Sequence, residues 1–102
     1  MEMSASWGID NGDEEVKNAA NSNIRFFTVS KSTALTPQNN VLGNWVESTP
    51  ETMKYFSAVG YFFAKRLRED LKNVPIGLIN VSHGGAPSDS FISPQAYAND
   101  LV

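Results

Sequence analysis

Two short apolar runs stand out in the pattern of hydrophobic and polar positions along the chain. The first is Asn23–Val29 (N-I-R-F-F-T-V) and the second is Ile76–Val81 (I-G-L-I-N-V). Both are rich in branched or aromatic residues and flanked by polar residues, proline or glycine, which predicts strands. We expect the first strand to be buried on both faces in its middle, and the second strand to be buried as well.

A helical pattern separates these two runs, over residues Ser57–Lys72. Apolar side chains recur there at spacings close to the helical period, which predicts one face packed into the core. That predicted face consists of Phe56, Val59, Phe63, Leu67 and Leu71.

Shorter elements are indicated by local signals. Thr49-Pro50-Glu51 is typical of a helix start, with threonine as the N-cap and proline at the first helical position. Asp13–Ala20 reads as a short helix with acidic residues in its first turn. Asn44–Ser48 reads as a short edge strand.

The alternation of helices and strands predicts an α/β fold built on a parallel sheet. Two parallel strands with open edges do not form a sheet that is stable alone. We therefore expect this chain to be a piece of a larger α/β domain.

Composition narrows the possible chemistry. The 102 residues include no cysteine and one histidine, which argues against a disulfide framework and against a thiolate or histidine-rich metal site. The net charge of −3, with no basic stripe, argues against nucleic acid as a partner. No apolar run is long enough for a membrane span, and the cellular location is not readable. We expect neither a metal nor a cofactor, and we predict no protein partner.

The candidate chemistry lies in the turn after the second strand, Ser82-His83-Gly84-Gly85-Ala86-Pro87. Ligands bind beyond the carboxyl ends of strands in open α/β sheets. The N–H groups of Gly84 and Gly85 could stabilise an oxyanion during acyl transfer, where one donor contributes about 3 kcal/mol. The alternative is a tight turn that merely requires glycine.

Three further side chains near this turn are candidates. His83 has no partner at a fixed spacing, so we favour a histidine in a pocket wall over a general base. Asp89 and Phe91 could contact a sugar beside the crevice, or could be a surface acid and a core aromatic.

Several segments, taken together, resemble the sialate O-acetylesterase family, carbohydrate esterases of the SGNH hydrolase superfamily. The resemblance covers nearly the whole chain in the family's order. Its segments are M-E-M at Met1–Met3, N-G-D-E-E-V at Asn11–Val16, N-I-R-F-F-T-V at Asn23–Val29, W-V-E-S-T-P-E-T at Trp45–Thr52, F-S-A-V-G-Y-F-F-A at Phe56–Ala64 and V-P-I-G-L-I-N-V-S-H-G-G-A-P at Val74–Pro87.

The resemblance implies a flavodoxin-like parallel sheet flanked by helices, incomplete in this chain, and serine-dependent hydrolysis of acetyl esters on sugars. It implies that residues 1–102 are the N-terminal portion of a single esterase domain. The family's nucleophile motif, Gly-Gln-Ser-Asn-Met-Glu-Met, would begin upstream of Met1, and its Asp-x-x-His pair would follow Val102. We therefore expect this chain to be inactive alone.

By resemblance, Gly84 and Gly85 lie at the oxyanion hole, with Gly85 as the preferred donor. His83, Asp89 and Phe91 stand where the family often has Trp, Glu and Trp; we take His83 and Asp89 as substrate-binding residues for an acetylated sugar. These departures leave the substrate open.

Two alternative functions remain. One is a non-catalytic carbohydrate-binding module that uses Trp7, Trp45 and the Asp89–Phe91 loop. The other is a lipase-like hydrolase that uses His83–Ala86 (H-G-G-A) as its oxyanion loop and requires a downstream G-x-S-x-G motif.

Overall fold

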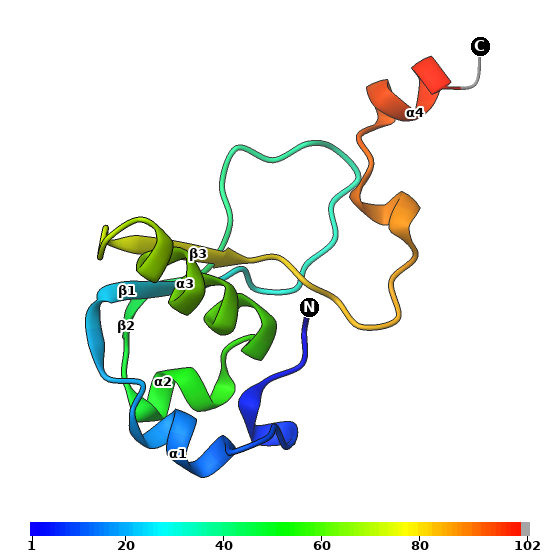
Figure 1. Cartoon of the computed structure of the whole chain (residues 1–102). Helices are drawn as coiled ribbons and strands as arrows, with labels where there is room; N and C mark the ends of the chain where they lie inside the picture. The colour runs from blue at the N-terminus through cyan, green and yellow to red at the C-terminus, as the bar shows by residue number, and fades with distance from the viewer. Residues whose placement is uncertain (101–102) are drawn as a thin grey trace.

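The structure is a computed structural model that describes residues 1–100 of the chain. Its helices and strands follow one another as a mixed α/β arrangement (Figure 1). In order they are η1 (Ala5–Trp7), α1 (Gly12–Lys17), β1 (Asn21–Thr28), β2 (Trp45–Ser48), α2 (Pro50–Tyr55), α3 (Ala58–Asp70), β3 (Ile76–Asn80), η2 (Ser88–Phe91) and α4 (Pro94–Asp100).

The three strands form one sheet in the order β2-β1-β3. β1 and β3 are parallel, with Phe26 opposite Leu78, as the α/β pattern predicts. β2 pairs with β1 in the antiparallel direction, with Phe26 opposite Val46. The predicted edge strand is therefore confirmed, and it makes the sheet mixed rather than purely parallel.

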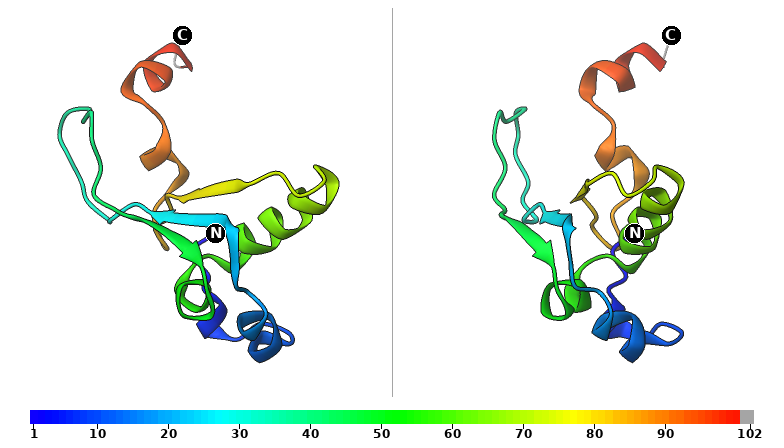
Figure 2. Two further views of the ribbon diagram at one scale, coloured as in Figure 1. Left: turned by 90° about the vertical axis from the view of Figure 1, so that its left-hand side faces the viewer. Right: turned by 60° about the vertical axis from the view of Figure 1, so that its left-hand side comes forward.

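One face of the sheet is covered by helices. Figures 1 and 2 show α1, α2 and α3 on the same side of the strands. The Phe26 side chain is 1% exposed there, and its ring stacks on Phe56 with the centroids 4.2 Å apart. Aliphatic and aromatic side chains from the sheet and helices complete this core. Its buried members are Ala5, Ala19, Ile24, Phe26, Met53, Phe56, Tyr61 and Ala64.

The other face is open, which corrects two predictions about burial. β1 is not buried on both faces, because Ile24 and Phe26 are buried while Arg25 between them is exposed. No residue of β3 is fully buried, and Ile79 is 64% exposed. The reason is that helices cover only one face, and β3 pairs with β1 alone within residues 1–100.

The predicted apolar face of α3 is also wrong in part. Val59 and Phe63 are 48% and 60% exposed, whereas Tyr61 and Ala64 are buried. Tyr61 lies edge-on to Phe26, with ring centroids 6.5 Å apart, so this side of the helix meets the sheet. Val59 and Phe63 instead line an open hollow of about 540 Å³ beside β3.

The helix starts follow the sequence signals. Thr49 caps α2 in a capping box, in which its hydroxyl accepts from the Thr52 N–H and Thr52 reaches back to the Thr49 N–H. The Ser57 hydroxyl caps α3 by accepting from the Gly60 N–H at 3.1 Å. Both caps satisfy amide groups that the first helical turn leaves unpaired.

Beyond β3 the chain leaves the packed body. η2 and α4, which the sequence analysis did not predict, extend away from the sheet (Figure 1). The longest dimension of the chain is 49 Å, against 29 and 24 Å in the other directions. No helix in residues 1–100 has the length and apolar character needed to cross a membrane.

Candidate active site

The turn after β3 lies at the carboxyl end of the two parallel strands. The Val29 N–H donates to the Asn80 carbonyl at 3.0 Å, which fixes the end of β3 against β1. The Ser82 hydroxyl donates to Asn80 Oδ1 at 2.7 Å, and the Ala86 N–H donates to the His83 carbonyl at 3.1 Å. These bonds order the turn that the sequence singles out.

The two glycines of this turn differ in their backbone conformation and in their neighbours. Gly85 has a φ of +80°, in the left-handed region that favours glycine, and a Cβ there would meet open space. Gly84 has an ordinary φ, but a Cβ on it would lie 2.5 Å from a carboxylate oxygen of Glu2. A side chain at Gly84 would therefore displace the end of the Glu2 side chain from its place beside the turn.

Glu2 joins three segments of the chain at this strand end. One of its oxygens accepts from the Gly84 N–H, and the other pairs with the Lys31 ammonium. The hydrogen bond from Lys31, and next the hydrogen bond from Gly84, lower the pKa of the Glu2 carboxyl below its ordinary value of 4.5. The positive charges of Lys31 and His83 act in the same direction, so Glu2 is a carboxylate at neutral pH.

The backbone around Glu2 is held against the start of α3. The Ser57 hydroxyl donates to the Met1 carbonyl, and the Ala58 N–H donates to the Met3 carbonyl at 2.8 Å. Ser4 and Ser57 also form an isolated antiparallel bridge. The N-terminal segment is thus fixed on both sides of Glu2.

Two open hollows flank the turn. One, of about 480 Å³, lies on the side of the N-terminal segment and is lined by Glu2, Trp7 and Gly84 among others. The second, of about 470 Å³, lies on the side of Lys31 and the loop that follows β1. Ser82, His83 and Phe91 line both hollows.

The structure therefore brings His83, Gly84 and Phe91 together at one hollow. Asp89 is exposed in η2 and is not among the residues that line either hollow. Glu2 and Lys31 were not singled out as site residues from the sequence, because they lie 82 and 53 positions from Gly84 and no local pattern links them.

The two tryptophans lie in different places. Trp7 lines the hollow beside Glu2. Trp45 packs against Phe27, with ring centroids 5.4 Å apart, and its ring lies 3.1–3.2 Å from where a Cβ on Gly77 would be. Trp45 therefore covers the sheet and lines a separate hollow with Arg25 and Pro75.

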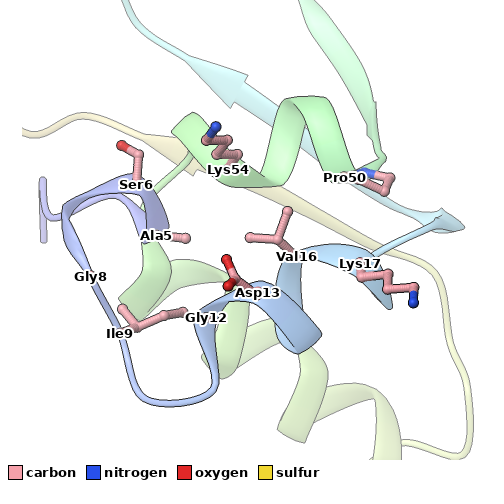
Figure 3. Close-up of a pocket in the computed structure, with 10 residues that line it drawn as sticks. All are labelled: Ala5, Ser6, Gly8, Ile9, Gly12, Asp13, Val16, Lys17, Pro50 and Lys54. Atoms are coloured by element: carbon pink, nitrogen blue, oxygen red, sulfur yellow. The ribbon is translucent and has the colours of Figure 1, made fainter.

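Another hollow lies between η1, α1 and α2, and no residue of the turn lines it (Figure 3). Its volume is about 560 Å³. Figure 3 shows the Asp13 carboxylate between Ala5 and Val16, while the ammonium groups of Lys17 and Lys54 point away from each other. None of the predicted site residues lines it. Over residues 1–100, no three His, Asp or Glu side chains gather as metal ligands.

Comparisons with known proteins find a match for this chain among solved structures. No family model matches the chain, and neither does any curated protein. Among solved structures, the chain is similar to a novel carbohydrate acetylesterase from Xanthomonas citri, with 35% sequence identity and a TM-score of 0.89. The match covers 98% of this chain and 23% of that one.

This match confirms the α/β fold, as part of an esterase fold. It also supports the resemblance to carbohydrate acetylesterases that the sequence segments indicate.

Proposed function

We propose that this chain is part of a carbohydrate O-acetylesterase, and that the turn after β3 supplies its oxyanion donor. The observation that carries the proposal is the 35% identity, sustained over 98% of the chain, to a carbohydrate acetylesterase. Residues 1–102 would form the N-terminal portion of the esterase domain. The proposed substrates are acetyl esters on sugars, of the kind that sialate O-acetylesterases hydrolyse.

Gly85 is the donor that we propose for the oxyanion. The Gly84 N–H is already used by Glu2, whereas the Gly85 N–H makes no hydrogen bond within the described part of the chain. A serine from outside these residues would attack the acetyl carbonyl, a histidine would accept its proton, and the Gly85 N–H would bind the oxyanion. His83 and Phe91, which line the hollows, would contact the sugar.

The test is a segment replacement. Residues 1–102 replace the matched segment of the Xanthomonas citri acetylesterase, and hydrolysis of an aryl acetate and of acetylated sugars is measured. We expect turnover by the chimera and none by the 102-residue chain alone, because the nucleophile and the base lie elsewhere. Aryl acetate turnover by the chain alone, blocked by a serine-directed inhibitor, would contradict the proposal.

A matched pair of glycine substitutions tests the oxyanion donor. Gly85 and Gly8 both have positive φ and open space at the Cβ position, so alanine strains the backbone at both without a steric clash. Only Gly85→Ala moves the proposed donor. We expect its chimera to lose about 10²-fold or more in kcat, and the Gly8→Ala chimera to keep its rate. Equal rates in the two chimeras would exclude Gly85.

The carbohydrate-binding module predicts a different result. A binding module of this kind requires that the chain alone binds sugar and that Trp45→Ala abolishes the binding. Trp45 and Trp7 line separate hollows, so they do not form one sugar site. Calorimetric titration of the chain with acetylated sugars separates it from the esterase.

A further inference from the structure

Hydrogen bonds to the neighbouring backbone hold Glu2 at the strand end. The carbonyls of Met1 and Met3, on either side of it, both accept hydrogen bonds from the start of α3. The backbone of Glu2 is thereby fixed, and its side chain, 27% exposed, crosses to the turn after β3. A carboxylate held in this way can act on the turn without itself moving.

The two oxygens of Glu2 have separate partners. One accepts from the Gly84 N–H, so it fixes the peptide plane that precedes Gly84. The other pairs with Lys31, which belongs to the loop after β1. The turn, the loop and the N-terminal segment are thus joined at a single carboxylate.

The charge of Lys31 has a specific consequence for the chemistry proposed above. An unpaired carboxylate beside Gly85 would repel an oxyanion on the neighbouring N–H, because like charges a few ångströms apart interact unfavourably. Lys31 neutralises that carboxylate. Glu2 can therefore fix the turn with little electrostatic penalty for an anion bound at Gly85.

We propose that Glu2, neutralised by Lys31, is a positioning residue that occupies the Gly84 N–H and so presents the neighbouring Gly85 N–H as the oxyanion donor. Its catalytic consequence rests on the proposed function; the hydrogen bond itself does not. Gly84 is part of the same arrangement, because any side chain there would displace the carboxylate.

The hydrogen bond is tested by a pH titration of the ¹⁵N-labelled 102-residue chain, followed at the backbone amide of Gly84 by NMR. We expect its proton resonance to move upfield as Glu2 is protonated, with a midpoint below 4.5, the ordinary pKa of a glutamate. The charged or titratable side chains that act on Glu2 are Lys31 and His83. The titration is therefore repeated in His83→Gln, where we expect the transition to persist with a midpoint raised by less than in Lys31→Met, because His83 has the smallest influence on Glu2.

Three variants make the assignment specific. In Glu2→Gln the transition of the Gly84 amide disappears, and in Lys31→Met its midpoint rises. Glu14→Gln removes an exposed carboxylate on α1 and leaves the transition unchanged. A Gly84 amide that still titrates in Glu2→Gln, or that does not titrate in the parent chain, overturns the proposal.

The catalytic consequence is measured in the chimera. We expect Glu2→Ala, which leaves no acceptor for the Gly84 N–H, to lower kcat by about 10-fold to 10²-fold with little change in KM, because a misplaced donor weakens binding of the transition state more than that of the substrate. A chimera that is active and unaffected by Glu2→Ala would overturn the positioning role while leaving the esterase proposal intact. An inactive parent chimera would instead contradict the proposed function, and the titration would still decide the hydrogen bond.

Discussion

The two faces of the same sheet differ sharply in this chain. On one face, Ile24 and Phe26 of β1 and their partners Ile76 and Leu78 on β3 pack against α1, α2 and α3. On the other face, Arg25 is exposed, and Ile79, the partner of Phe27, is 64% exposed. The free energy of folding in this chain therefore comes from one layer of contacts, and the open face contributes little to it.

The largest expected loss of stability comes from a substitution on the covered face of the sheet. Phe26→Ala removes a ring that stacks on Phe56, and we expect it to destabilise the chain by about 3–5 kcal/mol. Ile79→Ala, on the open face, is the control, with an expected cost below about 1 kcal/mol. Urea unfolding followed by circular dichroism measures both. Equal losses would mean that the open face is also packed in solution.

A smaller effect concerns the joint between β2 and the end of α1. The buried Ser48 hydroxyl donates to the Ala19 carbonyl at 2.6 Å. Ser48→Ala leaves that carbonyl buried without its donor, which we expect to cost about 1–3 kcal/mol in the same unfolding experiment. Ser22→Ala, at an exposed position on β1, should change the stability by less than about 0.5 kcal/mol. If Ser48→Ala left the free energy of unfolding unchanged, water would be reaching the Ala19 carbonyl at this end of the covered face.

The smallest effect lies at the rim of the covered face, where Lys65 on α3 pairs with Glu15 on α1 at 2.8 Å. The hydrogen bond to Glu15 raises the pKa of Lys65 above its ordinary 10.5. The stabilisation is therefore present in full below pH 10.5 and is lost as the pH rises through the folded pKa. Because both side chains are partly exposed, we expect only a few tenths of a kcal/mol.

The measurement compares thermal unfolding at pH 8 and pH 11 in the parent chain and in Lys65→Met. Burial raises the pKa of Tyr61, which also destabilises the fold at high pH, and the charge of Lys65 opposes that shift, so both proteins are compared in a Tyr61→Phe background. The parent should lose slightly more Tm than the variant. Identical losses would mean that the pair contributes nothing.

The sequence predicted which segments form helices and strands better than it predicted which of their side chains are buried. Branched and aromatic runs located β1 and β3, and Thr49-Pro50 located the start of α2, because these signals are local. The burial of Val59 and Phe63 was predicted wrongly, since periodicity finds an apolar face but not the layer that would cover it. η2 and α4 carry no strong periodic signal.

The same difference between local signals and tertiary contacts applies to the candidate site. His83, Gly84 and Gly85 are adjacent in sequence, so a single turn brought them together. The role of Glu2 could be found only in the folded structure. Hydrogen bonds to the start of α3 hold the N-terminal segment where Glu2 contacts the turn, and these contacts join residues far apart in the sequence. Asp89 follows the turn closely in sequence, yet it lines neither hollow, whereas Phe91 of the same η2 lines both.

The position of Trp45 also gives the open face an intrinsic spectroscopic probe. Its indole extends from β2 across β1 to Gly77 on β3, so its fluorescence depends on all three strands being in register. In a Trp7→Phe background the emission would come from Trp45 alone. A second layer placed on this face, by a longer form of the protein or by the chimera, would shield the indole and shift its emission to the blue.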